Sequence, residues 1–412
     1  MIEPKLRFKA FSDELSHHAL MDIIVEKPSN GIMNRQSDKV TAVKHINVID
    51  MYTDDKIHVD ELSYSEYGDT AVEKCNVEIG DIFLTRSSVK ADGIAKSNIL
   101  LDDGIYVYDD HLIRLKVDKN NYIPEFVNDY LASPRFRRQF IVRAKTTAFT
   151  TIGQGDVASC TGDFPSLPEQ QKIAEFLSTI DTVIEKQKET VSAWEERKKG
   201  VMQKLFSQEV RFKADDGSNF PEWEEKKLSD ISERILVGLA TTVTPYYREK
   251  GRPMFRNLNI KQGYLDDRDM LFLDDDYADS QKNKAIHFGD ILTVHTGNIG
   301  WSCLVPEKYE GALSFTTLIT TVKFNVVSNK YVCDFLNSPL GMNRMQNLAF
   351  SGGRANLNTS EFQKVQVPVP CLAEQQKIAD CLSSFDEVIE KQKATLAAWE
   401  ELKKGLLQQM FV

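Results

Sequence analysis

The sequence predicts an α+β protein: two mixed α/β domains separated by two long antiparallel coiled-coil helices, in a circular repeat with pseudo-two-fold symmetry. Three observations predict this fold. A 38-residue block occurs twice, at 169–206 and 374–411, with 25 identical positions and no gap. The block has the apolar spacing of a coiled coil. The sequence before each copy shows only faint similarity and is typical of short strands and turns.

The N-terminal element is a short strip. Residues 6–9 match residues 210–213, which follow the first copy of the block. The second copy ends beside Val412, where a strip of its own would begin. We therefore expect the N-terminal strip to take the place of the missing tail after the C-terminal helix. The order strip, domain, helix then occurs twice and closes on itself. Such a chain closes if the helices run antiparallel and the termini meet.

The two variable regions contain matching strands and helices. Residues 77–84 and 286–293 are apolar strand signals that each contain a Gly-Asp turn. Further on, 128–134 and 333–339 are helical segments that end in Ser-Pro, and the proline should stop each helix. The regions should therefore share one fold.

Polar loops follow these elements at matching places. The strands lead into loops at 85–90 and 295–301, and further loops at 146–154 and 351–358 precede the long helices. They are rich in Arg, Lys, Asn, Gln, Ser, Thr and aromatic side chains, which read base edges and bind phosphates in protein–DNA complexes. Any surface loop is also rich in Ser, Thr and Asn, so the paired placement carries the argument.

The repeated block should be a coiled-coil helix about 57 Å long. Apolar positions follow steps of four and three residues through 173–205 and 378–410. Both copies place a glutamine and a lysine on this seam, at Gln187, Lys198, Gln392 and Lys403. Polar seam residues fix the register and the partner. We also expect a capping box between Ser166 and Glu169, weaker at the second helix, where Cys371 replaces the serine.

Composition excludes several classes. The 412 residues carry a net charge of −10 with a pI near 5.4, which argues against a simple non-specific nucleic-acid binder. The six cysteines form no CxxC pair, as expected for reduced thiols and not for a zinc site. We find no signal peptide and no membrane-length apolar run, so a cytoplasmic location without membrane association is expected.

Motifs of catalysis are missing from the sequence. It contains no phosphate-binding GxxxxGK[ST] loop, no Asn-Pro-Pro-Tyr or Asp-Pro-Pro-Tyr methyltransferase run, no HExxH and no GxSxG. We therefore expect a non-enzyme with no catalytic residue, no bound metal and no cofactor of its own.

These features together resemble the DNA-specificity subunit of type I restriction-modification systems. The resemblance rests on the Glu-Gln-Gln-Lys-Ile-Ala starts at 169–174 and 374–379, the long helices, the Gly-Asp-Ile strands and the Val-Pro-Val-Pro run at 367–370. The first half departs from this pattern, because 162–168 replaces the Val-Pro run and no clear counterpart of 220–223 precedes its domain.

The resemblance implies a sequence-specific DNA-binding subunit that recognises a bipartite, gapped target and scaffolds two adenine-N6 methyltransferase (modification) subunits. Motor-nuclease (restriction) subunits would join for cleavage. The partners would use S-adenosylmethionine, and ATP with Mg²⁺ for restriction. The expected divisions are target-recognition domain 1 with the strip at 1–165, the central helix and tail at 166–213, target-recognition domain 2 at 214–370 and the C-terminal helix at 371–412.

Candidate contacts to double-stranded DNA come from the polar loops. In the first region they are Arg86, Ser87, Lys90, Arg143, Lys145, Thr147 and Gln154. In the second region they are Tyr246, Tyr247, Arg256, Asn257, His295, Thr296, Asn298, Trp301, Arg354 and Asn356. The ordinary interpretations stay open, since Trp301 is equally typical of a core residue and Arg256-Asn257 of a turn cap.

A different class of function also fits the sequence. A non-enzymatic coiled-coil scaffold could space two modules that bind protein or carbohydrate instead of DNA, and the acidic net charge is compatible with it. This alternative predicts no DNA binding even when partner subunits are present.

Overall fold

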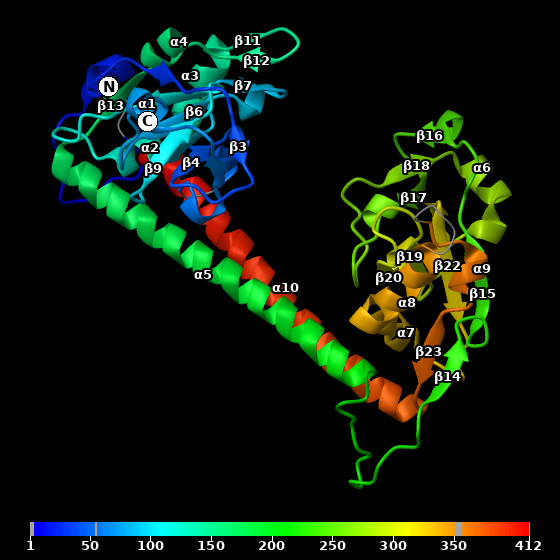
Figure 1. Ribbon diagram of the computed structural model, residues 1–412. Coiled ribbons are helices and arrows are strands. Elements are labelled where there is room, and N and C mark those ends of the chain that lie inside the picture. The colour runs from blue at the N-terminus through cyan, green and yellow to red at the C-terminus, as the bar shows by residue number, and fades with distance from the viewer. Residues whose placement is uncertain (1–3, 54–55, 351–355, 412) are drawn as a thin grey trace. The chain divides into compact units, whose positions relative to one another are not determined.

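The computed structural model describes residues 4–53, 56–350 and 356–411, and the chain forms two compact units (Figure 1). The first unit is Met1–Lys188 with Ala394–Val412, and the second is Glu189–Lys393. The division passes through the middle of both long helices. Each unit therefore combines one globular part with half of each helix, whereas the sequence-based division set the helices apart from the domains.

The same four-stranded antiparallel sheet forms the centre of each unit. In the first unit the order is β2 (Ser29–Asn30), β10 (Leu112–Leu115), β6 (Ile82–Thr85) and β8 (Ser97–Ile99). In the second it is β15 (Ser232–Val237), β22 (Thr317–Val322), β19 (Ile291–Val294) and β20 (Ser302–Leu304). The apolar parts of the two predicted strand segments are β6 and β19, so the shared fold is confirmed.

The Gly-Asp turn before each of these strands has one structure in both units. Gly80 and Gly289 have φ values of +87° and +83°, a region that favours glycine. The following aspartates are buried and accept a backbone hydrogen bond three residues back, from Glu78 N to Asp81 at 2.9 Å and from His287 N to Asp290 at 2.9 Å. The predicted turn is thus fixed by a buried carboxylate as well as by glycine.

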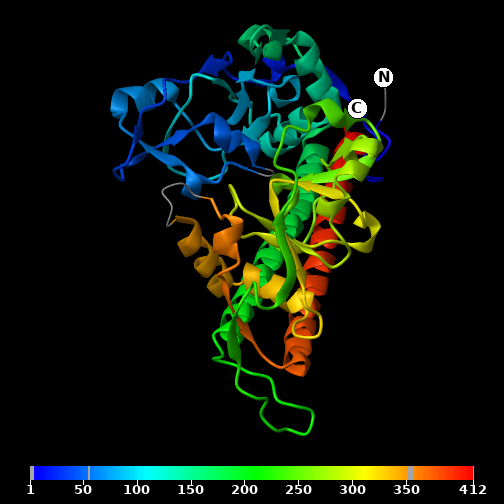
Figure 2. The ribbon, with the colours of Figure 1, turned by 90° about the vertical axis from the view of Figure 1, so that its right-hand side faces the viewer.

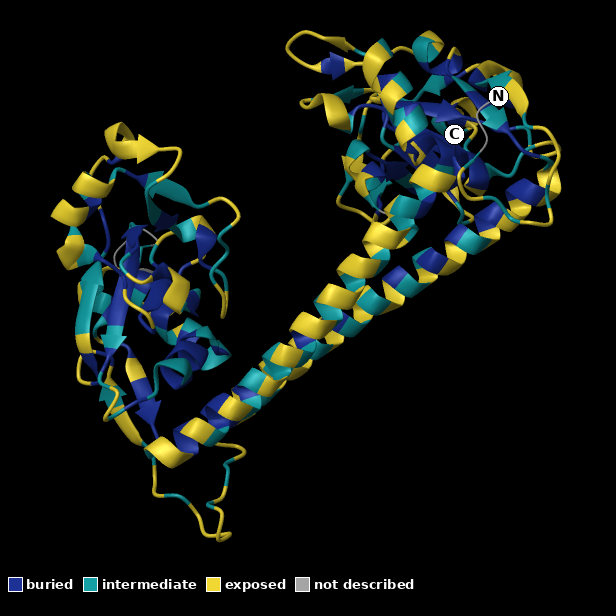
Figure 3. Ribbon diagram, turned by 180° about the vertical axis from the view of Figure 1, so that it is seen from behind, coloured by how far each residue is buried: buried dark blue, intermediate teal, exposed yellow. Residues whose placement is uncertain are grey.

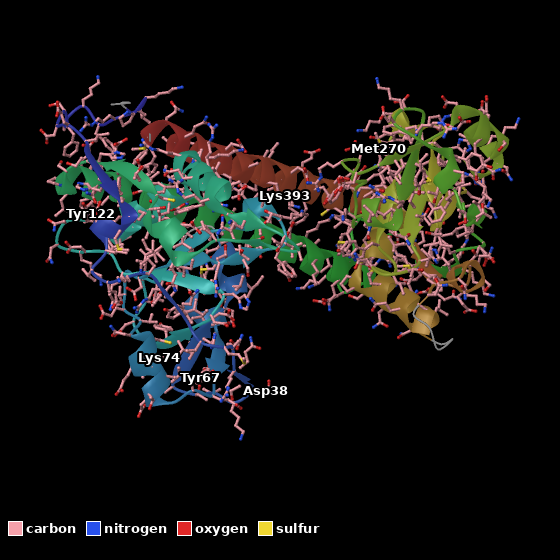
Figure 4. The ribbon with its side chains drawn as sticks, turned by 90° about the horizontal axis from the view of Figure 1, so that it is seen from above. Asp38, Tyr67, Lys74, Tyr122, Met270 and Lys393 are labelled. Carbon is pink, nitrogen blue, oxygen red and sulfur yellow. The ribbon has the colours of Figure 1, made fainter. Side chains whose placement is uncertain are left out.

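A second four-stranded sheet adds a lobe to each unit. The first comprises β3 (Gln36–Ser37), β5 (Ser63–Ser65), β4 (Val43–Ile46) and β9 (Ile105–Tyr108), with helix α1 (Asp69–Cys75) beside it. The second comprises β16 (Tyr247–Arg248), β18 (Leu271–Leu273), β17 (Arg252–Arg256) and β21 (Leu313–Phe315), with α6 (Asp275–Ser280). Figure 4 labels Asp38, Tyr67 and Lys74 together in the first lobe.

Short helices follow the central sheet in matching order. The pairs are α2 (Pro124–Ala132) and α3 (Pro134–Arg143), and α7 (Asn329–Asn337) and α8 (Pro339–Phe350). Each Ser-Pro ends one helix, as predicted, and its proline also begins the next, where the missing N–H costs nothing. Then come α4 (Gln154–Ala158) and α9 (Thr359–Phe362), and two-stranded sheets pair β1 (Ser16–Ala19) with β13 (Thr161–Phe164) and β14 (Glu224–Lys227) with β23 (Gln366–Val369).

The long helices are α5 (Leu167–Phe206) and α10 (Leu372–Met410), and they pack antiparallel within each unit. Ion pairs mark the register: Lys403 Nζ lies 2.5 Å from Asp181 Oδ1 in the first unit, and Lys198 Nζ lies 2.5 Å from Asp386 Oδ1 in the second. The predicted apolar seam is buried or half-buried along both helices, while the outward faces are exposed (Figure 3). Among the described residues, no helix has the length and apolar character needed to cross a membrane.

The strip after each helix confirms the circular repeat. Leu6 N donates to the carbonyl of Gln409 at 3.0 Å, and Val210 N donates to the carbonyl of Lys204 at 3.2 Å. The N-terminal strip therefore binds the end of α10 as residues 210–213 bind the end of α5. The strip that contains Leu6 and the end of α10 lie side by side in the first unit (Figures 1 and 2).

A buried glutamate begins each long helix. Arg7 donates to both oxygens of Glu169 at 2.7 Å, and Arg211 donates to both oxygens of Glu374 at 3.1 and 2.9 Å. The glutamate side chains are 2% and 0% exposed. The expected capping box with Ser166 is therefore wrong, because the carboxylate of Glu169 faces an arginine that is distant in sequence.

The two units differ at one charged position in the equivalent helices α2 and α7. In the second unit, Lys330 Nζ lies 2.6 Å from the buried Asp334, and in the first unit Glu125 takes the place of that lysine beside Asp129. Burial raises the pKa of Asp129 to about 7, against the attraction of Lys403. Asp129 therefore lacks the cation that Asp334 has on its own helix, and its carboxylate is costly to ionise.

Asp129→Asn should therefore stabilise the first unit above neutral pH. Because the folded-state pKa of Asp129 is raised from 3.8, its stabilising contribution is complete below about pH 4 and is lost as pH rises through about 7. We expect the variant and the wild type to have nearly equal unfolding free energies at pH 3.5, and the variant to be more stable by up to about 4 kcal/mol at pH 8. Urea unfolding at both pH values measures this.

Asp334→Asn is the matched comparison. Burial also raises the pKa of Asp334, but Lys330 lies 2.6 Å away and opposes that shift, so the gain in stability at pH 8 should be smaller than for Asp129→Asn. Equal effects of the two substitutions at pH 8 would contradict the assigned asymmetry.

A circular permutant should keep the fold. Joining 411 to 5 through a short glycine-serine linker and opening the chain between Gln208 and Glu209 leaves every helix and strip intact, since the strips occupy equivalent places. We expect the unfolding temperature to change by less than about 5 °C. Opening the chain inside α5, after Glu189, is the control and should lower it much further. Equal losses from both openings would contradict the circular arrangement.

Candidate nucleic-acid interface

The first candidate surface joins two of the predicted loops. Strand β7 (Ser87–Ser88) follows the central strand β6 and pairs with β12 (Thr150–Thr151), which forms a hairpin with β11 (Lys145–Thr146) (Figure 1). Ile152 N also donates to the carbonyl of Arg86 at 3.0 Å. We call residues 86–90 and 145–151 the first loop cluster.

The second unit builds the equivalent surface from different residues. Leu357 N donates to the carbonyl of His295 at 2.9 Å, the counterpart of the bond from Ile152 to Arg86. The ring of His295 lies 2.7 Å from Asn356 Oδ1 through its Nδ1 atom, and Thr296 Oγ1 donates to the same oxygen at 3.2 Å. We call residues 295–298 and 356–358 the second loop cluster. Its backbone frame matches the first, whereas its side chains do not.

Most predicted residues of the first region lie on the first loop cluster. Arg86, Lys90, Lys145 and Thr147 are exposed there, and Ser87 is half-buried in β7. Arg143 precedes the hairpin and donates to the carbonyl of Gln139 at 3.3 Å. Gln154 lies apart from this set, because its amide contacts Asn30 of β2.

The predicted residues of the second region divide into two groups. His295, Thr296, Asn298 and Asn356 belong to the second loop cluster, and Asn257 approaches it with its Nδ2 atom 3.5 Å from the carbonyl of Thr296. The others have different surroundings: Tyr246 stacks on Tyr277 at 3.8 Å, Tyr247 is in β16, Arg256 donates to the carbonyl of Asp269 and Trp301 packs against a buried apolar cluster. Arg354 lies outside the described residues.

Two of the four arginines of helix α3 bind other parts of the first unit. Arg137 in α3 donates to the carbonyls of Asp92, Ile94 and Ala95, so it holds the chain that follows β7. Arg135 pairs with Asp163 at 2.7 Å. These two arginines are therefore structural. Arg86, Lys90 and Lys145 are the exposed cations of the loops, and Arg138 of α3 is exposed as well.

Sequence reasoning missed two apolar members of this surface. Val89 and Phe149 are exposed in the first loop cluster, between the predicted cations. The sequence signal for this surface was a single aromatic residue, Phe149, within a run of threonines. That its hairpin lies beside the loop after β6 could be known only from the pairing of β7 with β12.

One group of possible metal ligands lies near Arg86. Among the described residues, Asp109, Asp110 and His111 bring three ligand atoms within 4.8 Å of one another in the turn after β9. Exposed acidic turns of this kind are common without an ion, and His111 already shares its ring Nδ1 atom with both aspartates.

Comparison with known proteins identifies the family. The model of the type I restriction modification DNA specificity domain matches residues 64–192 and 221–398, which is most of the chain and both units. The chain belongs to this family. Helix α5 and helix α10 each carry the end of one match, so the type I specificity fold of this chain includes the helices as well as the sheets.

Individual relatives agree with the family assignment. A putative type I restriction enzyme MjaX specificity subunit from Methanocaldococcus jannaschii is 24% identical over 401 residues, covering 93% of this chain and 90% of its own length. The MjaVIII specificity subunit of the same organism is 25% identical over 253 residues, 59% of each chain.

Solved structures share the fold. The S subunit of a type I restriction-modification system from M. genitalium matches with a TM-score of 0.54 and 14% identity, over 100% of this chain and 99% of that one. A chain from a study of complex assembly and conformational transition of the type I R-M system matches with a TM-score of 0.56 and 15% identity, over 96% and 97%.

The His295–Asn356 contact should couple the two loops of the second cluster in this type I specificity fold. In urea unfolding, a double-mutant cycle of His295→Ala and Asn356→Ala should give a coupling of about 1 kcal/mol, because the side chains form a direct hydrogen bond. Combining Asn356→Ala with Lys282→Ala, an exposed residue of the same unit, should be additive. Additivity in the first cycle would show that the loops are held by backbone contacts alone.

Proposed function

We propose that this chain is the non-catalytic, sequence-specific DNA-binding subunit of a type I restriction-modification complex. The observation that carries the proposal is the pair of loop clusters. Each cluster follows the equivalent strand of its unit, β6 or β19. Each is held by the equivalent backbone hydrogen bond, from Ile152 N to the carbonyl of Arg86 or from Leu357 N to the carbonyl of His295. The exposed side chains of the two clusters differ. Two equivalent frames with different surfaces suit two half-sites that differ in sequence.

The side chains of each cluster match the chemistry of DNA reading. Arg86, Lys90 and Lys145 offer cations to phosphate oxygens, and the amide of Asn298 offers the donor and acceptor that base edges require. The net charge of −10 is compatible with this function because the first loop cluster itself exposes Arg86, Lys90 and Lys145. Affinity would then depend on salt, and specificity on the neutral polar groups.

The helix pair supplies the second part of the proposal. Helices α5 and α10 present long exposed faces along an antiparallel seam with matched ion pairs, so each unit offers a related docking surface. We propose that two adenine-N6 methyltransferase subunits bind there, that motor-nuclease subunits join them, and that the partners bring S-adenosylmethionine, ATP and Mg²⁺. The target adenine must leave the base stack during methylation, a task for the methyltransferase.

Co-expression with a competent type I methyltransferase subunit in a methylation-free host tests the proposal. Single-molecule sequencing should show N6-methyladenine in one split motif that appears only when this chain is present. An assembled, competent complex that marks no motif would contradict the proposal and favour a scaffold for ligands other than DNA.

Single substitutions should separate phosphate contacts from base contacts. In the assembled complex, Arg86→Ala should weaken binding about 10-fold and reduce the slope of log affinity against log salt by about 1, because one cation is lost. Asn298→Ala is the matched control, and it should leave the salt slope unchanged while relaxing the second half-site. Fluorescence anisotropy across a salt series measures both, and equal slopes for all three proteins would contradict the assigned phosphate contact.

A further inference from the structure

Two exposed apolar side chains occupy adjacent tips of the first loop cluster. Val89 is 80% exposed and Phe149 is 56% exposed. Thr150 pairs with Ser88 and Thr151 with Ser87 in antiparallel register. The pairing ends there, and Val89 and Phe149 are the next residues of the two chains at that end of the ladder, so both lie in the loops that continue from it.

The tip is supported by hydrogen bonds from the surrounding chain. Thr147 N donates to the carbonyl of Phe149 at 3.0 Å, and the hydroxyls of Thr146 and Thr150 lie 3.0 Å apart, which closes the hairpin. Across from it, Arg137 binds the carbonyls that follow Val89. The fold therefore holds an aromatic ring in water, although burying such a ring typically stabilises a protein by about 2 kcal/mol.

The charge around the tip favours a polyanionic partner. Residues 143–153 contain Arg143 and Lys145 and no acidic residue. Residues 86–91 contain Arg86 and Lys90, and the acids beside them are Asp92, next in the chain, and Asp110, whose carbonyl accepts from Arg86 at 3.5 Å. An apolar tip bordered by cations is the arrangement of DNA-binding elements that insert a side chain between bases while lysine and arginine hold the phosphates.

We propose that Phe149, backed by Val89, is a wedge that enters a groove of the first half-site and packs against a base step, partly unstacking it. This inference rests on the proposed DNA-binding function and adds a positioning residue to it. Unstacking sets a deformation cost that depends on the base step, so Phe149 would contribute specificity at a position without hydrogen-bonded readout.

Binding and fluorescence of the assembled methyltransferase complex test the wedge, once its motif has been mapped. Duplexes carry 2-aminopurine at successive positions of the first half-site, with the methylated adenine left unlabelled so that base flipping does not contribute. Wild type should raise the fluorescence at one base step. Phe149→Ala should abolish that rise and weaken binding about 10-fold, whereas Phe149→Trp should retain both. Phe288→Ala, which removes an exposed phenylalanine of the second unit, should leave both unchanged.

The outcomes separate the wedge from the function on which it rests. If the wild-type complex marks no motif, the proposed function fails and the wedge fails with it. If the wild type marks its motif and Phe149→Ala binds and fluoresces as wild type does, only the wedge is overturned. If Phe149→Ala instead lowers assembly with the methyltransferase at unchanged DNA affinity of the assembled complex, the tip contacts protein and the wedge is overturned. Thermal unfolding of Phe149→Ala should match wild type, since the ring is exposed.

Discussion

The buried glutamate at the start of each long helix is the interaction on which both units depend. Glu169 and Glu374 each accept two hydrogen bonds from an arginine of the strip that follows the other helix. The next residue, a buried glutamine, binds the domain: Gln170 accepts from Ile123 N at 3.1 Å, and Gln375 accepts from Ser328 N at 2.8 Å. Two adjacent side chains thereby join strip, domain and helix. Removing one partner of such a buried pair typically costs about 3–5 kcal/mol.

The backbone features that hold the loop clusters are the same in both units, whereas the exposed side chains differ. The helix starts, the Gly-Asp turns and the backbone bonds of Ile152 and Leu357 are the same in both units. The exposed residues that these bonds present are different, with arginine and lysine in one cluster and histidine, threonine and asparagine in the other. A recognition surface can therefore change its side chains without disturbing the frame, which is the property that a subunit with two dissimilar half-sites requires.

Features governed by local sequence were predictable. The spacing of apolar residues predicted the seam between the long helices. The duplicated strip predicted that these helices run antiparallel, and the positions of glycine and proline predicted the turns and the helix ends. Features that depend on distant partners were not predictable. Glu169 looked like a capping residue because its partner Arg7 is 162 positions away, and Phe149 looked unremarkable until the pairing of β7 with β12 brought its loop and the loop of Val89 to the same end of one ladder. For the same reason Gln154, Tyr246 and Trp301 were predicted as contacts from their loops alone, without the neighbours that now surround them.

In the proposed function, the length of the helix pair sets the gap between the two half-sites. Inserting one heptad into each helix at equivalent places, after Thr190 and after Thr395, keeps the antiparallel register and lengthens the pair by about 10.5 Å. Sequencing the methylated motif made by this variant with its partner is the most direct test. The account predicts that both half-sites stay the same while the gap grows by about three base pairs. A methylated motif with an unchanged gap would contradict it.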